Sequence, residues 1–278
     1  MAGGPRGIRL VVFDLAGTVV DHGCFAPVTP FIEALARHGV DITAERVRGP
    51  MGTAKIDHLR ALLALPDAAS QWRARHGRDV MDIDIVRLYE QDFVPLQLAS
   101  VDVESALIPG ALDCIEQLRS RGIAVGTTTG YFAAAADACI AMARRQGFAP
   151  DVSVHSDQVP AGRPAPWMMF RVMETLGIYP PSAVVKVGDT PPDVEEALNA
   201  GAWAVGVAAT GNSVGLRAAA LDALPAGERA TRVAQARREL LDAGAHHVID
   251  SVRDLPPLLP IIEEQIGMPR RDCHRERG

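Results

Sequence analysis

Short apolar runs alternate with amphipathic helical patterns along most of this 278-residue chain. The first run, residues 8–13, is rich in β-branched side chains and stops at Asp14, which is typical of a buried parallel strand that ends in a polar loop. Similar runs occupy residues 123–128, 183–187, 204–207 and 247–249, and helical patterns occupy residues 111–121, 131–146, 166–176 and 193–200. This alternation predicts a doubly wound α/β fold with a mainly parallel sheet.

One long segment interrupts the alternation. From about residue 23 to residue 109 the pattern is helical and contains no convincing strand, with helical stretches at residues 28–38, 44–48, 54–65 and 84–99. We therefore expect a helical cap domain inserted after the first strand. A second insert, residues 211–243, is rich in Ala, Arg and Leu with helical periodicity. The expected domains are a core at residues 1–22 and 100–267, a cap at residues 23–99 and a flexible tail at residues 268–278.

Composition argues against nucleic-acid and membrane partners. The net charge is −6 and the basic residues are scattered, so the basic footprint of such binders is missing. The first apolar run is short and interrupted by Arg9, which excludes a secretory signal or a membrane span. The cysteines show no paired spacing, as expected for free thiols in a reducing compartment: Cys24, Cys114, Cys139 and Cys273. We expect a cytoplasmic protein that acts on a small molecule.

Asp14 stands where chemistry is expected in such a fold. Ligands of open α/β sheets bind at the carboxyl ends of the strands, and Asp14 ends the first one. Its carboxylate can attack an electrophile or hold a divalent cation, and the following Gly17-Thr18 can present backbone N–H groups to a phosphate. Taken alone, the residue is equally well explained as a turn cap.

Two further carboxylates follow another predicted strand. Asp189 and Asp193 come directly after residues 183–187, so three acids converge on one edge of the sheet. That much negative charge needs a cation, and hard carboxylate oxygens suit Mg²⁺ better than zinc. Asp193 can also interact with the dipole of the helix that it begins, and the two roles are compatible.

These motifs together resemble the haloacid dehalogenase superfamily of phosphotransferring hydrolases. The matching segments are residues 13–18, the strand end at residues 127–130, Arg163, and residues 188–193. The resemblance implies that Asp14 is the nucleophile and that Thr129, Gly130 and Arg163 bind the phosphoryl group. It also implies that Mg²⁺ is held by Asp14, Asp189 and the carbonyl oxygen of Ala16, with Asp193 behind them.

Ala16 departs from the pattern of that superfamily. Its phosphomonoesterases carry a second aspartate two positions after the nucleophile, and this residue protonates the leaving alkoxide. Alanine cannot transfer a proton, so an ester hydrolase built on this site would lack its general acid. Something else must manage the leaving group.

Lys55 lies in the predicted cap, beside the apolar stripe of its helix. A lysine next to apolar surface loses hydration, which lowers its pKa and leaves more neutral amine to attack a carbonyl. His58, three residues later, lies on the same helix face and could ferry protons. Without further context, a surface lysine that covers apolar residues with its stem is the more common explanation.

A second resemblance supplies that context. Residues 21–27, 51–52, 55–58 and 160–164, together with Ala16, resemble the phosphonoacetaldehyde hydrolase family, the imine-forming branch of the superfamily. The resemblance implies that Lys55 forms an imine with an aldehyde phosphonate and that the C–P bond is hydrolysed to acetaldehyde and phosphate. It also implies a homodimer through the cap. The residues expected to line the substrate pocket are Met51, His58, Cys24 and Tyr131, with His22 at the hinge.

Two rival functions remain open from the sequence. One is a phosphate-ester hydrolase of the same fold that works slowly without its acid, and the other is a non-catalytic phosphate sensor with the same acidic pocket. Cys24 and Tyr131 could equally be packing residues, and Gly52 could simply begin a helix. A dinucleotide-binding fold is disfavoured because no G-x-G-x-x-G follows the first strand.

Overall fold

A six-stranded, fully parallel sheet forms the centre of the computed structural model, which describes residues 7–266. The strands follow the order β3-β2-β1-β4-β5-β6, so β1 lies between β2 and β4. The predicted tail at residues 268–278 lies outside the described residues. The strand bounds are β1 Leu10–Phe13, β2 Ala124–Thr129, β3 Val152–His155, β4 Val184–Gly188, β5 Trp203–Val207 and β6 His247–Ile249.

Helices cover both faces of this sheet. Successive side chains of a strand point to opposite faces, so Val11 and Phe13 pack in one apolar cluster while Leu10 and Val12 pack in another. The first face is covered by α7 (Ala111–Ser120), α8 (Ala133–Arg145) and α13 (Leu255–Gln265), and the second by α9 (Trp167–Leu176), α10 (Pro191–Ala200) and α12 (Ala226–Asp242). The predicted doubly wound fold is confirmed.

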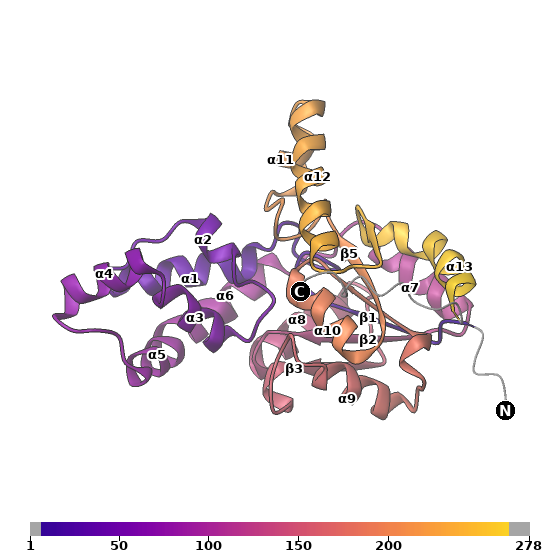
Figure 1. Cartoon of the computed structure of the whole chain (residues 1–278), viewed down its shortest axis with the longest axis horizontal. Coiled ribbons are helices and arrows are strands. Elements are labelled where there is room, and N and C mark those ends of the chain that lie inside the picture. Colours follow the sequence, from indigo (N-terminus) through magenta and orange to yellow (C-terminus); the bar gives the residue numbers. More distant parts are fainter. Residues whose placement is uncertain (1–6, 267–278) are drawn as a thin grey trace, which may run out of the picture.

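The segment between β1 and β2 is helical and lies to one side of the sheet (Figure 1). Its helices are α1 (Phe25–Arg37), α2 (Ala44–Arg48), α3 (Lys55–Leu63), α4 (Pro66–His76), α5 (Asp82–Leu88), a π-helical turn at Tyr89–Phe93 and α6 (Val94–Glu104). Phe31 of α1 packs against Phe93 with ring centroids 4.3 Å apart, and both side chains are fully buried. The boundary predicted between residues 99 and 100 falls inside α6.

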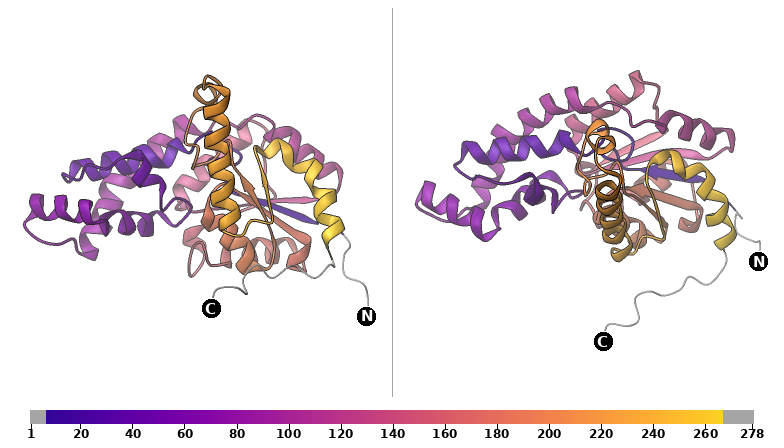
Figure 2. Two further views of the ribbon diagram at one scale, coloured as in Figure 1. Left: turned by 45° about the horizontal axis from the view of Figure 1, so that its top comes forward. Right: turned by 90° about the horizontal axis from the view of Figure 1, so that it is seen from above.

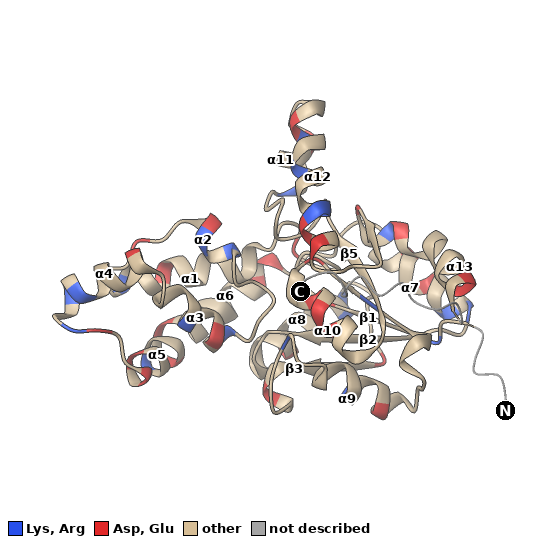
Figure 3. Cartoon of the chain, in the orientation of Figure 1, with Lys and Arg blue, Asp and Glu red and all other residues tan. Residues whose placement is uncertain are grey.

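The second insert is helical as well. It contains α11 (Ala218–Asp222) and α12, which rise from the core as a projecting pair (Figure 2). Acidic and basic residues are interspersed along both the inserted helices and the core helices, as the scattered charge pattern predicted (Figure 3). Within residues 7–266, no helix is both long and apolar enough to span a membrane.

Candidate active site

The carboxyl ends of β1, β2 and β4 meet the inserted helices at a small cavity. Because these three strands are neighbours in the sheet, the residues that follow them are brought to one edge. The loop between α2 and α3 closes this edge from the opposite side, since a Cβ on Gly130 would lie only 2.5 Å from the carbonyl oxygen of Thr53. The cavity is lined by Asp14, Ala16, Cys24, Pro27, Met51, Gly52, Lys55, Thr129, Gly130, Tyr131, Arg163 and Thr190.

Asp14 is buried at the base of the cavity and contacts Arg163. The Arg163 Nη2 donates to Asp14 Oδ1 at 2.8 Å. Burial raises the pKa of Asp14, because removal from water penalises its charged form more than the guanidinium stabilises it. The Asp14 carboxylate is therefore largely removed from solvent, with Arg163 as its charged partner.

A buried charge network lies behind Asp14. Arg163 also pairs with Asp193 at 2.9 Å and with Glu196 at 3.0 Å. Lys186 of β4 pairs with the same Asp193 at 2.9 Å and lies 3.6 Å from Glu196. Although burial opposes it, the charges of Arg163 and Lys186 lower the pKa of Asp193. Because several partners fix the Arg163 guanidinium, it presents its positive charge to Asp14 in one orientation.

Asp189 has a different environment. It accepts hydrogen bonds from the Thr18 hydroxyl at 3.0 Å, the Cys24 thiol at 3.3 Å and the Asn212 backbone N–H at 2.7 Å. Within residues 7–266, no lysine or arginine forms an ion pair with it. Burial, and then the charges of Asp14 and Asp193, raise the pKa of Asp189 to about 8. Within the described residues, no positively charged side chain compensates the charge of the Asp189 carboxylate.

The acidic residues fit a divalent metal ion. Asp14, Asp189 and Asp193 each offer an oxygen, and these three atoms lie within 4.8 Å of one another. Arg163 and Lys186 already balance the charge of Asp193, whereas Asp14 has only a shared contact with Arg163, and Asp189 has no ion pair within residues 7–266. Oxygen donors of this kind suit hard divalent cations.

Gly17 lies directly against the Asp189 carboxylate, at a position that only glycine can occupy. Its backbone has φ +80°, and a Cβ there would lie 2.4 Å from an oxygen of Asp189. Any other side chain would be strained by the backbone and would collide with that carboxylate.

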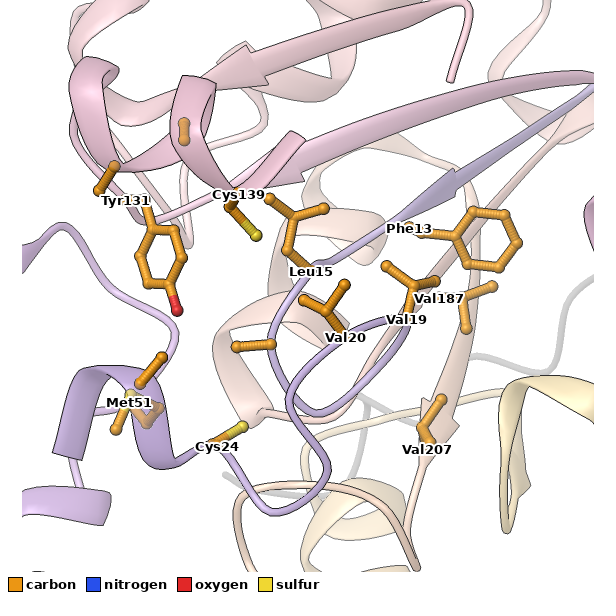
Figure 4. Packing of buried hydrophobic residues seen from close by; sticks show 14 of the residues in the cluster. Phe13, Leu15, Val19, Val20, Cys24, Met51, Tyr131, Cys139, Val187 and Val207 are labelled. Atoms are coloured by element: carbon orange, nitrogen blue, oxygen red, sulfur yellow. The ribbon is translucent and has the colours of Figure 1, made fainter. Parts of the chain in front are cut away.

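Lys55, the first residue of α3, brings an amine to the same cavity. Only 4% of Lys55 is exposed, and burial lowers its pKa to about 8 even though the charge of Asp14 opposes the shift. Its Nζ lies 3.9 Å from the sulfur of Met51 and 5.3 Å from the centre of the Tyr131 ring. Tyr131 points from the end of β2 toward Met51 on the inserted segment, with Cys24 nearby (Figure 4). Lys55 and Lys186 are the only lysines in the sequence.

His58 lies behind the cavity and does not line it. The fully buried ring contacts the Val47 carbonyl oxygen through Nε2 at 2.7 Å and stacks on Phe31 with centroids 4.0 Å apart. Burial, and then the nearby Lys55, hold the pKa of His58 well below its usual value. The interpretation of His58 as a pocket residue therefore does not match this geometry, because the backbone carbonyl and the aromatic ring hold the imidazole inside the helical group.

The other predicted site residues lie close together. Asp14, Ala16, Cys24, Met51, Lys55, Thr129, Gly130, Tyr131 and Arg163 line the cavity, and Asp189 and Asp193 adjoin it. His22 instead contacts the Leu216 carbonyl oxygen at 2.8 Å. Sequence reasoning missed Lys186, Glu196, Thr190 and Pro27 as parts of the site. One signal was available, since Lys186 is a charged residue inside an otherwise apolar strand.

The fold and the acid-lined strand ends define a hydrolase of the haloacid dehalogenase class. Residues 8–201 match the family model described as haloacid dehalogenase-like hydrolase. A phosphonoacetaldehyde hydrolase from Syntrophobacter fumaroxidans is 46% identical over 94% of both chains, and one from Nitratidesulfovibrio vulgaris is 40% identical over 94% of this chain and 92% of its own. The chain belongs to the phosphonoacetaldehyde hydrolase family.

A solved structure is similar along nearly the whole chain. The crystal structure of a phosphonoacetaldehyde hydrolase-like protein from Oleispira antarctica is 36% identical, with a TM-score of 0.92 over 94% of both chains. The similarity therefore includes the inserted helices as well as the core.

Proposed function

We propose that this protein hydrolyses the C–P bond of phosphonoacetaldehyde to acetaldehyde and phosphate. The observation that carries the proposal is the buried amine of Lys55 at the cavity that contains Asp14, where Ala16 takes the position of a proton donor. A carbanion is a poor leaving group, so the C–P bond needs an electron sink more than it needs an acid. A lysine amine that forms an imine supplies that sink.

The reaction divides between the two residues. The neutral Lys55 amine adds to the aldehyde, and the adduct takes up one proton from solvent and loses water to give a protonated imine. Asp14 then attacks phosphorus, and the electron pair of the breaking P–C bond moves into the imine to give an enamine. Water hydrolyses the resulting aspartyl phosphate to phosphate. Protonation of the enamine carbon and hydrolysis of the imine release acetaldehyde and restore the Lys55 amine.

Arg163, Thr129 and Gly130 are the proposed phosphonate-binding residues. All three line the cavity, and Arg163 already lies 2.8 Å from Asp14. Its guanidinium can donate to phosphonate oxygens as negative charge develops on them. Cys24, Met51 and Tyr131 enclose the rest of the cavity, and their poorly polar side chains keep the Lys55 amine from being fully hydrated.

The proposed metal is Mg²⁺, held by Asp14, Asp189 and the carbonyl oxygen of Ala16, with Asp193 behind them. Its chemical contribution is to offset the negative charge of the phosphonate as the Asp14 carboxylate approaches. The support for this assignment is the all-oxygen donor set and the uncompensated charge of Asp189. Arg163 and Lys186 keep Asp193 ionised, so Asp193 can orient neighbouring donors without being neutralised itself.

Domain organisation and assembly remain proposals too. We place the cap at α1–α6, Phe25–Glu104, because α6 continues past residue 99 without interruption. The core then comprises the sheet with α7–α13. A homodimer that meets through the cap helices stays a prediction from the family. A cytoplasmic location stays a prediction from the cysteine pattern and the short first apolar run.

The decisive experiment measures acetaldehyde and phosphate released from phosphonoacetaldehyde by the purified chain with MgCl₂. We expect equal amounts of both products from the wild type, and a loss of turnover on the order of 10⁴-fold for Lys55→Arg. Borohydride added during turnover should convert Lys55 to an N-ethyl derivative, detectable by peptide mass spectrometry.

Each rival predicts a different result. A phosphate-ester hydrolase would cleave p-nitrophenyl phosphate equally well before and after Lys55→Arg. A phosphate sensor would bind inorganic phosphate and release no acetaldehyde. Either result would contradict the proposed reaction.

A further inference from the structure

Arg48 links the inserted helices to the core through hydrogen bonds. These bonds lie away from the two chain crossings, which are the points beside Phe25 and Glu104 where the chain passes between the core and the inserted helices. Arg48 ends α2, and its Nη1 donates to the backbone oxygen and to Oδ1 of Asn212, both at 3.2 Å. Its Nη2 donates to the Gly215 carbonyl oxygen at 3.5 Å. In return, Asn212 Nδ2 donates to the Arg48 carbonyl oxygen at 3.0 Å. Four hydrogen bonds thus join α2 to the loop that follows β5.

The same loop lies directly on Asp189. The Asn212 backbone N–H donates to Asp189 Oδ2 at 2.7 Å, and a Cβ on Gly211 would lie 2.6 Å from the Asp189 Cβ. One residue, Asn212, therefore contacts Asp189 through its backbone and Arg48 through its side chain. Any movement of the loop toward or away from α2 also changes the hydrogen bonding of Asp189.

On the other side, α2 is tied to the helix that carries the reactive amine. Val47, the neighbour of Arg48, accepts the hydrogen bond of His58, and His58 lies on α3 three residues after Lys55. His58 and Phe31 are fully buried, so α2 and α3 pack together with α1. The contacts run without interruption from Asp189 through Asn212, Arg48 and His58 to the helix of Lys55.

A separate contact fixes the base of the inserted segment. Arg217 donates to both carboxylate oxygens of Glu104, at 2.7 and 2.5 Å, and its guanidinium lies 4.4 Å from the centre of the Phe25 ring. Phe25 and Glu104 are the first and last residues of the inserted helices. The Arg217–Glu104 ion pair thus stabilises the chain crossings. The Arg48 hydrogen bonds lie farther into the inserted segment, so they resist its rotation about those crossings.

We propose that Arg48 and Asn212 form a latch that keeps the cap closed over the active site and couples closure to the placement of Asp189. Both are positioning residues, and the inference rests on the proposed function only for the roles of Lys55 and Asp189. Because coupling between two sites is reciprocal, a cation that orders Asp189 also favours the closed cap, and a closed cap favours cation binding. The latch thereby buries the Lys55 amine when the acidic site is filled.

The test uses the two lysines of the chain as reporters. The amines that a reagent such as acetic anhydride can acetylate in this sequence are Lys55, Lys186 and the amino terminus. Peptide mass spectrometry then gives the labelling rate at each lysine, with and without MgCl₂ and in the absence of substrate. We expect Mg²⁺ to slow Lys55 labelling in the wild type, because it favours the closed cap.

Arg48→Met should speed Lys55 labelling about tenfold, remove most of the protection by Mg²⁺ and leave Lys186 labelling unchanged. The matched control is Arg46→Met on the same helix, where the side chain is exposed and only approaches Asp67 at 3.7 Å. Asn212→Ala keeps the backbone bond to Asp189 and removes two of the four bonds with α2, so it should speed Lys55 labelling in the same direction as Arg48→Met but by less. The double variant should speed labelling by less than the product of the two single effects, because the two side chains share a hydrogen bond.

Three results would overturn the latch. They are equal Lys55 labelling in the Arg48→Met and Arg46→Met variants, equal Mg²⁺ protection in both, and a parallel rise at Lys186, which would indicate general loosening of the fold. None of them depends on turnover. A protein that labels as expected but releases no acetaldehyde would keep the latch and reject the proposed reaction.

Discussion

The two lysines of this chain are both buried at the active site, yet their surroundings differ. Lys186, on β4 of the core, contacts Asp193 and Glu196 and donates to the Thr128 hydroxyl at 2.8 Å. Lys55, on α3 of the inserted segment, contacts a methionine sulfur at 3.9 Å and lies over an aromatic ring. The two buried amines therefore differ in their partners, since of the two only Lys186 is paired with carboxylates in the part of the chain that the structure describes. The absence of a directly bonded carboxylate among the described residues around Lys55 leaves burial to lower its pKa.

Of the changes considered, removal of Lys186, the lysine that is paired with carboxylates, should have the largest effect, and it should act on the free energy of unfolding. Lys186→Met leaves Asp193 and Glu196 buried with one cation fewer, which should lower the free energy of unfolding by about 3–5 kcal/mol. Lys55→Met is the control, because it removes an amine that no carboxylate holds, and we expect a change within about 1 kcal/mol. Urea unfolding without added metal measures both. Similar losses in the two variants would refute the contrast drawn between the lysines.

Met51→Glu should make Lys55 resemble Lys186. The substitution puts a carboxylate where the sulfur now lies 3.9 Å from Nζ, and a nearby opposite charge favours the ammonium form. We expect borohydride trapping at pH 7 to fall by about tenfold or more, since each unit of pKa removes about nine-tenths of the neutral amine. Met51→Gln, which has similar size and no charge, should trap nearly as well as the wild type. If both variants lose trapping equally, side-chain shape rather than charge governs the amine.

The smallest effect needs no substitution. With a pKa of about 8, Lys55 is mostly ammonium below pH 8 and mostly neutral above it. The initial rate of trapping in the wild type should therefore fall about fivefold from pH 8 to pH 7 and level off above about pH 9. A trapping rate that keeps rising to pH 10 would show an ordinary, solvated lysine.

Local patterns in the sequence predicted most of the fold because they depend on neighbouring residues. The alternation of β-branched runs and amphipathic patterns located β1, β2, β4, β5 and β6, and the span 44–48 coincides with α2. The strand β3, Val152–His155, escaped notice because its sequence alternates apolar and polar residues and contains no continuous apolar run. Its single neighbour, β2, is a contact that no local pattern reveals.

The site was predictable only where a motif marks it. Asp14, Asp189 and Arg163 lie in motifs, so their convergence could be inferred from strand ends. Glu196 looks like an ordinary helix residue, and it joins the site only because α10 packs against β4. Arg48 and Asn212 lie 164 positions apart, and neither carries a local signal of the other. His58 was misplaced because helix spacing gives the face of a residue and not the depth at which it lies.

The confinement of both amines to the interior affects how the protein tolerates aldehydes. Every other cationic side chain apart from the histidines is an arginine, and a guanidinium, which stays protonated at any physiological pH, does not condense with carbonyl compounds as a free amine does. Acetaldehyde that diffuses away therefore meets no competing lysine on the exterior. Reagents such as glutaraldehyde, which join proteins through surface lysines, should leave this one uncoupled except at its amino terminus.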